Sequence, residues 1–181
     1  MQPDLILKNA NIANGQTGVD IACQNGKIVE IASHIDVPAV EVLDCGGMLV
    51  SPPFVDSHFH MDATLSLGLP RMNESGTLLE GIALWGELKP LLTPEAVIER
   101  ALKYCDLAVS KGLLAIRTHV DVCDDRLLAV DALLEVKKQV APYIDLQLVA
   151  FPQDGYLRSP TAKENTIRAL DKGVDVVGGI P

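Results

Sequence analysis

Two histidines separated by one residue are the clearest chemical signal in the sequence. His58 and His60 close the apolar segment Ser51-Pro-Pro-Phe-Val-Asp-Ser-His-Phe-His-Met-Asp62, although the chain has only four histidines. Side chains alternate between the faces of a strand, so both imidazoles should point the same way, about 7 Å apart along the backbone. Two imidazoles so placed can bind one metal ion. We therefore predict that His58 and His60 are metal ligands. The alternative is one ordinary hydrogen-bonded histidine and one chance neighbour.

Two further polar residues follow later apolar runs. His119, within Arg117-Thr-His-Val-Asp121, could bind substrate, support another side chain or anchor a loop, and Arg117 could pair with Asp121. Gln153 follows Ala150-Phe-Pro and carries a donor and an acceptor on one amide, which suits recognition of a heterocycle edge. A loop glutamine more often just contacts solvent, so both interpretations of Gln153, substrate recognition and solvent exposure, stay open.

From residue 48 onward the pattern alternates between strands and long helices. Helices are expected at 93–112, 126–140 and 159–173, and strands at 114–120, 144–151 and 174–180. This order implies parallel βα units, whose functional residues gather at the carboxyl ends of the strands. Because the candidate residues all follow strands, the pattern favours the N-terminal part of a (β/α)8 barrel over a doubly wound sheet.

The first part of the chain has a different pattern. Residues 1–47 contain short strands at 4–8, 19–23 and 27–32, and Asn25-Gly26 is a strong hairpin signal. We predict a small antiparallel β module at 1–47 and the first three to four βα units at 48–181. A whole barrel needs about 250 residues, so we expect a truncated barrel.

Composition narrows the possible partners. The net charge is −9, with 24 acidic and 15 basic residues and no basic cluster, which argues against a nucleic-acid partner. No apolar run approaches the roughly 20 residues that span a bilayer, so we expect no membrane partner and a cytoplasmic location. The phosphate-binding glycine motifs are missing as well. The expected partners are a small heterocyclic substrate and water, with a homo-oligomer left open.

The segments around the candidate residues resemble a known family. The β module followed by His-x-His is similar to the start of the amidohydrolase superfamily. Ser75-Gly-Thr-Leu-Leu-Glu-Gly-Ile82 and Val149-Ala-Phe-Pro-Gln-Asp-Gly155 narrow the resemblance to bacterial cytosine deaminases. It covers nearly the whole chain from about residue 48, as the N-terminal portion of such an enzyme.

The resemblance implies particular roles. His58 and His60 match the first two ligands of one divalent zinc or iron ion, Gln153 matches the glutamine that recognises the pyrimidine edge, and Leu78 matches a backbone contact to substrate. His119 carries over no settled role and stays a weak substrate-binding candidate. The remaining ligands and the proton-shuttling glutamate of the family would lie beyond Pro181, so no catalytic residue is expected within the chain.

The predicted function is metal-dependent hydrolytic deamination of cytosine or a similar pyrimidine-like ring, with release of ammonia. One alternative is a related amidohydrolase that acts on a triazine, creatinine-like or isocytosine-like ring. The other is an inactive truncated protein that needs a partner. Activity of the 181-residue chain alone is doubtful, because two imidazoles give too few ligands for a tight metal site.

Overall fold

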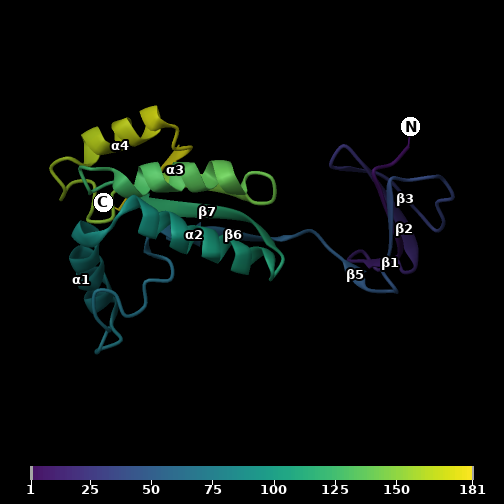
Figure 1. The fold of residues 1–181 in the computed structure, drawn as a ribbon, viewed down its shortest axis with the longest axis horizontal. Helices are drawn as coiled ribbons and strands as arrows, with labels where there is room; N and C mark the ends of the chain where they lie inside the picture. Colours follow the sequence, from purple (N-terminus) through teal and green to yellow (C-terminus); the bar gives the residue numbers. More distant parts are fainter. Residues whose placement is uncertain (1, 181) are drawn as a thin grey trace. The chain divides into compact units, whose positions relative to one another are not determined.

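The structure is a computed structural model that describes residues 2–180 and forms two compact units, which divide between Pro52 and Pro53 (Figure 1). The sequence placed the boundary at residue 47. It lies later because Leu49–Val50 forms a strand, β5, that pairs with the first strand of the N-terminal unit. Residues 48–50 therefore belong to the N-terminal unit and not to the first βα unit, where the sequence placed them.

The N-terminal unit is a small β-sheet. Its strands are β1 (Leu5–Ile12), β2 (Val19–Gln24), β3 (Lys27–Ala32), β4 (Glu41–Asp44) and β5 (Leu49–Val50). They lie in the order β3-β2-β1-β4, with β5 also paired to β1. The pairs β1–β2 and β2–β3 are antiparallel, whereas β4 and β5 run parallel to β1. The sheet is thus mixed: β1 to β3 pair antiparallel, as expected for the predicted module, whereas the parallel pairing of β4 and β5 was not predicted.

The turn between β2 and β3 is the one that the sequence predicted. Gln24 pairs with Lys27, and the two residues between them have positive φ, 51° at Asn25 and 71° at Gly26. Asparagine and glycine adopt this left-handed conformation more easily than other residues, and such turns match the twist of a hairpin. The Asn-Gly pair therefore sets the register of β2 and β3.

Asp20 is the main buried charge of this unit. Its carboxylate accepts hydrogen bonds from Lys8 Nζ at 2.8 Å, Ile35 N at 2.9 Å and Asn9 N at 3.1 Å. Burial alone would raise the pKa of Asp20, but these donors outweigh it and hold the pKa at about 2, below the ordinary 3.8. The ionised carboxylate thus ties β1, β2 and the segment after β3 together.

Replacing Asp20 with asparagine should destabilise the N-terminal unit in a pH-dependent way. Because the folded-state pKa is lowered, the stabilisation is complete above about pH 4 and disappears as the pH falls toward 2; two pKa units correspond to about 2 to 3 kcal/mol. Hydrogen exchange of the β1 and β2 amides at pH 7 and at pH 3 measures the difference. The exposed Asp36→Asn variant is the control. An Asp20→Asn effect of equal size at both pH values would contradict the assignment.

The C-terminal unit is a parallel sheet with helices between its strands. The strands are β6 (Phe54–Phe59), β7 (Leu113–Asp121), β8 (Asp145–Phe151) and β9 (Val176–Val177), in that order across the sheet. The helices are α1 (Leu78–Leu88), α2 (Pro94–Val109), α3 (Leu128–Val140) and α4 (Ala162–Lys172), and two 3₁₀ turns are η1 (Met61–Ala63) and η2 (Lys89–Leu91). All strand pairs are parallel, as the alternating pattern predicted.

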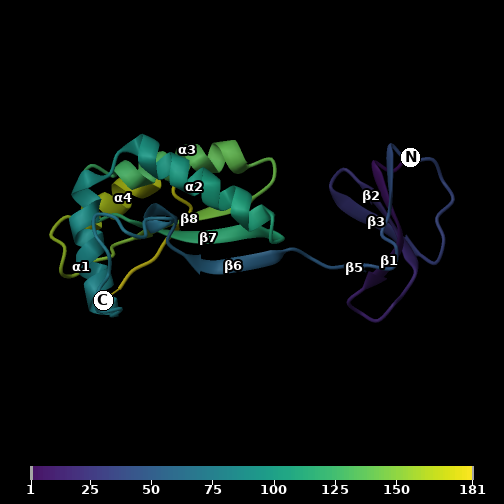
Figure 2. The same ribbon diagram turned by 60° about the horizontal axis from the view of Figure 1, so that its bottom comes forward.

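Helices α2 and α3 pack on one face of β7 and β8 (Figure 2). Helix α2 supplies four fully or nearly buried side chains to the core, where they meet buried side chains of α3, β7 and β8. These residues are Val97, Ala101, Cys105 and Ala108 of α2, Val130, Leu133 and Val136 of α3, Ile116 of β7, and Leu146 and Leu148 of β8. Thr93 caps the start of α2, since its Oγ1 accepts from Ala96 N at 3.3 Å. This core fixes the carboxyl ends of β6, β7 and β8 next to one another.

Two features of this unit differ from the sequence-based expectations. The last strand covers only Val176–Val177 rather than residues 174–180. Helix α1 was not predicted, although Thr77 followed by Glu80 is a capping pattern, and Thr77 Oγ1 indeed accepts from Glu80 N at 3.3 Å. Helix α1 lies near the carboxyl ends of the strands (Figure 1).

Among the helices of residues 2–180, none is both long enough and apolar enough to span a bilayer.

Candidate metal and substrate site

Three imidazoles lie together at the carboxyl ends of β6 and β7. The ring centroids are 5.3 Å apart for His58 and His60, 4.1 Å for His58 and His119, and 5.5 Å for His60 and His119. Phe59, between the two β6 histidines, turns away and stacks on Tyr104 of α2 at 4.2 Å. Strand alternation thus places His58 and His60 on the same side, as predicted, and Phe59 on the other.

The pKa shifts of His60 and His119 favour metal binding. Burial, together with the neighbouring His119 and His58 rings, lowers the pKa of His60, and burial lowers the pKa of His119. Both shifts favour the neutral imidazole, which is the form that binds a metal ion. His119 Nδ1 lies 3.4 Å from the carbonyl oxygen of Phe59, a long hydrogen-bond distance.

His58 and His60 could hold a metal ion only together with further ligands. Within residues 2–180, no group of three or more histidine, cysteine, aspartate or glutamate side chains has the geometry to hold a metal. His58 and His60 supply two nitrogen donors, whereas zinc sites in proteins usually have three or four protein ligands. The described residues therefore fit a contribution of two ligands to a metal centre, not a complete centre.

A pocket of about 350 Å³ lies beside His60. Its lining comes from η1, α1 and the loop after β8: His60, Asp62, Ala63, Leu78, Gly81, Ile82, Trp85 and Gln153. The volume lies within the range of small-molecule sites, and most of the lining side chains are apolar. The pocket can therefore hold a small molecule that contacts the His60 ring and the Gln153 side chain.

The pocket brings together three of the residues singled out from the sequence. His60, Leu78 and Gln153 all line it, whereas His58 and His119 do not line it and lie beside the His60 ring. The suggested Arg117–Asp121 pair is not formed, since Arg117 Nε donates to Gln147 Oε1 at 2.6 Å. Asp121 has other partners.

The Asp121 carboxylate is the centre of a hydrogen-bonded group below the pocket. Its Oδ2 accepts from Trp85 Nε1 and from Lys89 Nζ, each at 2.8 Å, and its Oδ1 accepts from Cys123 N at 2.8 Å. Burial alone would lower the pKa of Lys89, but the hydrogen bond to Asp121 raises it, so Lys89 remains an ammonium. This ion pair therefore joins the end of α1 to the end of β7.

Asp62 is a second buried carboxyl group at this position. Burial raises the pKa of Asp62 to about 7, although N–H groups of Asp121 and Ala63, each 2.9 Å from a carboxylate oxygen, oppose the shift. Arg100 of α2 donates to the carbonyl oxygens of Asp62 and Thr64 at 3.1 and 3.0 Å. These bonds hold the turn that follows His60.

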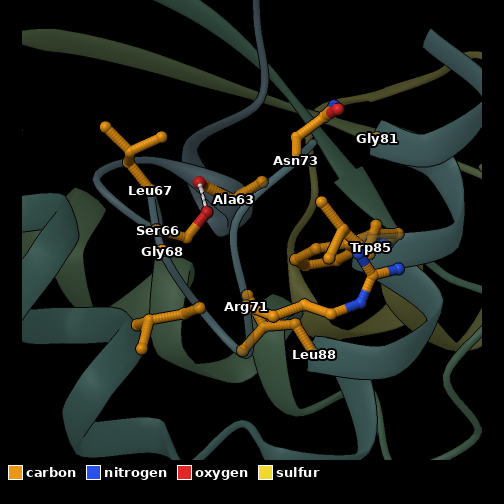
Figure 3. A pocket seen from close by; sticks show the side chains of 11 residues that line it. Ala63, Ser66, Leu67, Gly68, Arg71, Asn73, Gly81, Trp85 and Leu88 are labelled. Carbon is orange, nitrogen blue, oxygen red and sulfur yellow. Dashed lines mark hydrogen bonds between the residues drawn. The ribbon is translucent and has the colours of Figure 1, made fainter. Parts of the chain in front are cut away.

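A second cavity of about 200 Å³ adjoins the pocket, with Ala63, Gly81 and Trp85 lining both. Figure 3 shows Trp85 and Arg71 on one side of this cavity and the turn with Ala63, Ser66 and Leu67 on the other. Arg71 is held by Glu80 and Glu87 of α1, at 2.7 and 2.9 Å. The indole of Trp85 is thus a wall shared by two cavities.

Sequence reasoning missed Trp85 and Lys89 as site residues. Both belong to α1 and η2, which were not predicted, and their partners lie more than 30 positions away in the chain. The Thr77–Glu80 capping pattern could have revealed the helix and thereby the position of Trp85, which is the sole tryptophan of the sequence.

Comparisons with known proteins agree with this geometry. A family model described as "Amidohydrolase family" matches residues 41–176. The chain is 33% identical to N-isopropylammelide isopropyl amidohydrolase of Pseudomonas sp. (strain ADP), over 98% of this chain and 45% of that protein.

Solved structures of similar enzymes match the chain as well. The structure of 5-methylcytosine deaminase from Klebsiella pneumoniae with 5-fluorocytosine matches with a TM-score of 0.89 and 43% identity, over 97% of this chain and 43% of that one. N-isopropylammelide isopropylaminohydrolase from Burkholderia multivorans shares the fold at 24% identity and a TM-score of 0.82. The chain spans less than half the length of these proteins, 43 to 45%. Its mixed sheet and parallel sheet correspond to the N-terminal part of such barrel enzymes.

Proposed function

Because the chain belongs to the amidohydrolase family, whose members are metal-dependent hydrolases, we propose that it takes part in hydrolytic deamination of cytosine or a similar pyrimidine-like ring. The observation that carries the proposal is the pocket in which His60, Leu78 and Gln153 meet. The 43% identity to 5-methylcytosine deaminase supports this substrate class. In the reaction, water replaces the exocyclic amine of the ring, a carbonyl forms at that carbon, and ammonia leaves.

His58 and His60 would hold the metal ion. The two side chains lie on the same side at the end of β6. The lowered pKa of His60 keeps its ring neutral, so that a ring nitrogen has a free electron pair for a metal ion. A divalent zinc or iron ion, when bound, lowers the pKa of a water molecule and so supplies a nucleophile at neutral pH. Asp62 and the turn held by Arg100 keep the end of β6 in place.

The pocket lining would orient the ring. The Gln153 side chain can donate and accept at once, which matches the adjacent acceptor and donor of a pyrimidine edge. The Leu78 N–H lies in the first turn of α1, where helical amides lack partners within the helix, so it can donate to a ring carbonyl. Trp85 would cover the ring and exclude water from it.

A second candidate is amine release from an N-alkylaminotriazine. It is favoured by the 33% identity, over nearly the whole chain, to a protein named for hydrolysis of N-isopropylammelide. The cavity on the other side of Trp85 would offer space for a ring substituent. The two candidates share the metal ligands and differ in the ring that Gln153 would recognise.

A substrate panel distinguishes the two. The full-length gene product, supplied with zinc or iron, is incubated with cytosine, 5-methylcytosine, isocytosine, creatinine and N-isopropylammelide, and released ammonia or amine is measured. The proposal expects the highest kcat/KM for cytosine or 5-methylcytosine. Release of isopropylamine with no ammonia from any pyrimidine would replace it by the second candidate, and no release from any ring would contradict both.

A further inference from the structure

The Asp121 carboxylate lies where three parts of the pocket meet. Its side chain is only 2% exposed, at the carboxyl end of β7. It accepts from the indole N–H of Trp85 on α1 and from the ammonium of Lys89 on η2, while the backbone N–H of Asp121 donates to Asp62 after β6. One residue thus bonds to the segments that follow β6 and to the helix that covers the pocket.

Lys89 extends this connection to the loop after β8. Its ammonium, with a side chain 15% exposed, donates to Asp121 Oδ2 at 2.8 Å and to Asp154 Oδ2 at 3.1 Å. Asp154 is the neighbour of Gln153, whose side chain lines the pocket. A continuous series of hydrogen bonds therefore runs from Trp85 through Asp121 and Lys89 to the loop that carries Gln153.

The hydrogen bonds that Asp121 and Lys89 form are charge-assisted. Hydrogen bonds that involve an ionised donor or acceptor are stronger than neutral ones, and those that water cannot replace count most. An asparagine at position 121 would carry no charge and only one accepting oxygen for the three donors Trp85 Nε1, Lys89 Nζ and Cys123 N. Among the described residues, Lys89 would then keep the half-exposed Asp154 as its remaining ion-pair partner. The indole and the Gln153 loop would then be free to adopt other positions.

We infer that Asp121 is a positioning residue for substrate binding: it holds Trp85 as a pocket wall directly, and the Gln153 loop through Lys89 and Asp154. The inference rests on the proposed function for its effect on catalysis. The structural part of the inference, that Asp121 holds Trp85 in position, is independent of the proposed function.

The fluorescence of Trp85 tests the structural part without any substrate. Trp85 is the sole tryptophan of the 181 residues, so in the full-length gene product the emission difference between a variant of this part of the chain and its matched control reports on this indole. Asp121→Asn is expected to shift the emission maximum and to increase acrylamide quenching about twofold. Asp131→Asn, which removes an exposed partner of Lys172 on the outer helices, is the matched control and should change neither.

Steady-state kinetics of the full-length gene product test the effect on binding. For Asp121→Asn the KM for cytosine should rise about tenfold or more, with kcat changed less than about threefold and metal content unchanged. A merely structural role would lower the Tm without this split. Trp85→Phe, which keeps an aromatic ring and removes the donor, and Asp154→Asn, which weakens the Lys89 branch, should each raise KM by less.

Failure of the positioning role and failure of the proposed function give different results. Unchanged emission, quenching and KM in a folded Asp121→Asn protein would overturn the inference. If that variant does not fold, Trp85→Phe and Asp154→Asn decide it by their KM values. If the wild-type protein deaminates none of the rings, the proposed function fails, and the fluorescence comparison alone decides the positioning role.

Discussion

Replacing His58 or His60 with alanine in the full-length gene product is expected to remove bound metal and to lower the deamination rate by about 1,000-fold or more, equivalent to about 4 kcal/mol of transition-state stabilisation. The reason is that each variant leaves a single imidazole at the end of β6.

Metal content by mass spectrometry and ammonia release from cytosine check this prediction together. His34→Ala is the matched control, since His34 lies in the N-terminal unit with a side chain 73% exposed. It should retain both properties. A folded His58→Ala or His60→Ala protein with stoichiometric metal and ordinary activity would contradict the ligand assignment.

Replacing Gln153 with alanine is expected to lower kcat/KM for cytosine by about 100-fold while metal content stays the same. A site built to hydrogen-bond a ring edge loses about 1 to 3 kcal/mol when one such group is removed. Gln153→Glu should change the order of preference among rings, because a carboxylate accepts but does not donate. Helix α1 and the histidines are not altered by either change.

Substrate panels for the two variants, run beside metal analysis, give the measurement. Gln139→Ala on the exposed side of α3 is the control and should match the wild type. The opposite pattern, with metal lost and ring preference retained, would show that Gln153 supports the metal centre rather than the substrate.

Local rules predicted much of the framework that holds these residues. Alternation along β6 was enough to place His58 and His60 together, since it depends only on backbone geometry. The Asn25-Gly26 turn and the Thr93 cap were likewise predictable, because each depends on residues within four positions. Gly173 ends α4 with φ of 111°, a conformation that favours glycine.

The rest depended on contacts between distant segments. Nothing local indicates that Glu41–Asp44 and Leu49–Val50 pair in parallel with β1, so the mixed sheet was missed. Asp121 was considered as a partner of Arg117, four positions away, yet it pairs with Lys89 and Trp85. Helix α1 packs over the pocket, and only the fold brings its tryptophan next to the strand ends.

Metal dependence of cytosine hydrolysis is the most direct test of the account. The full-length gene product is stripped with a chelator, and ammonia release from cytosine is measured before and after addition of one equivalent of zinc or iron. We predict that the metal-free protein releases no ammonia and that one of the two metals restores release, but not in the His58→Ala protein. Undiminished release by the metal-free protein would contradict it.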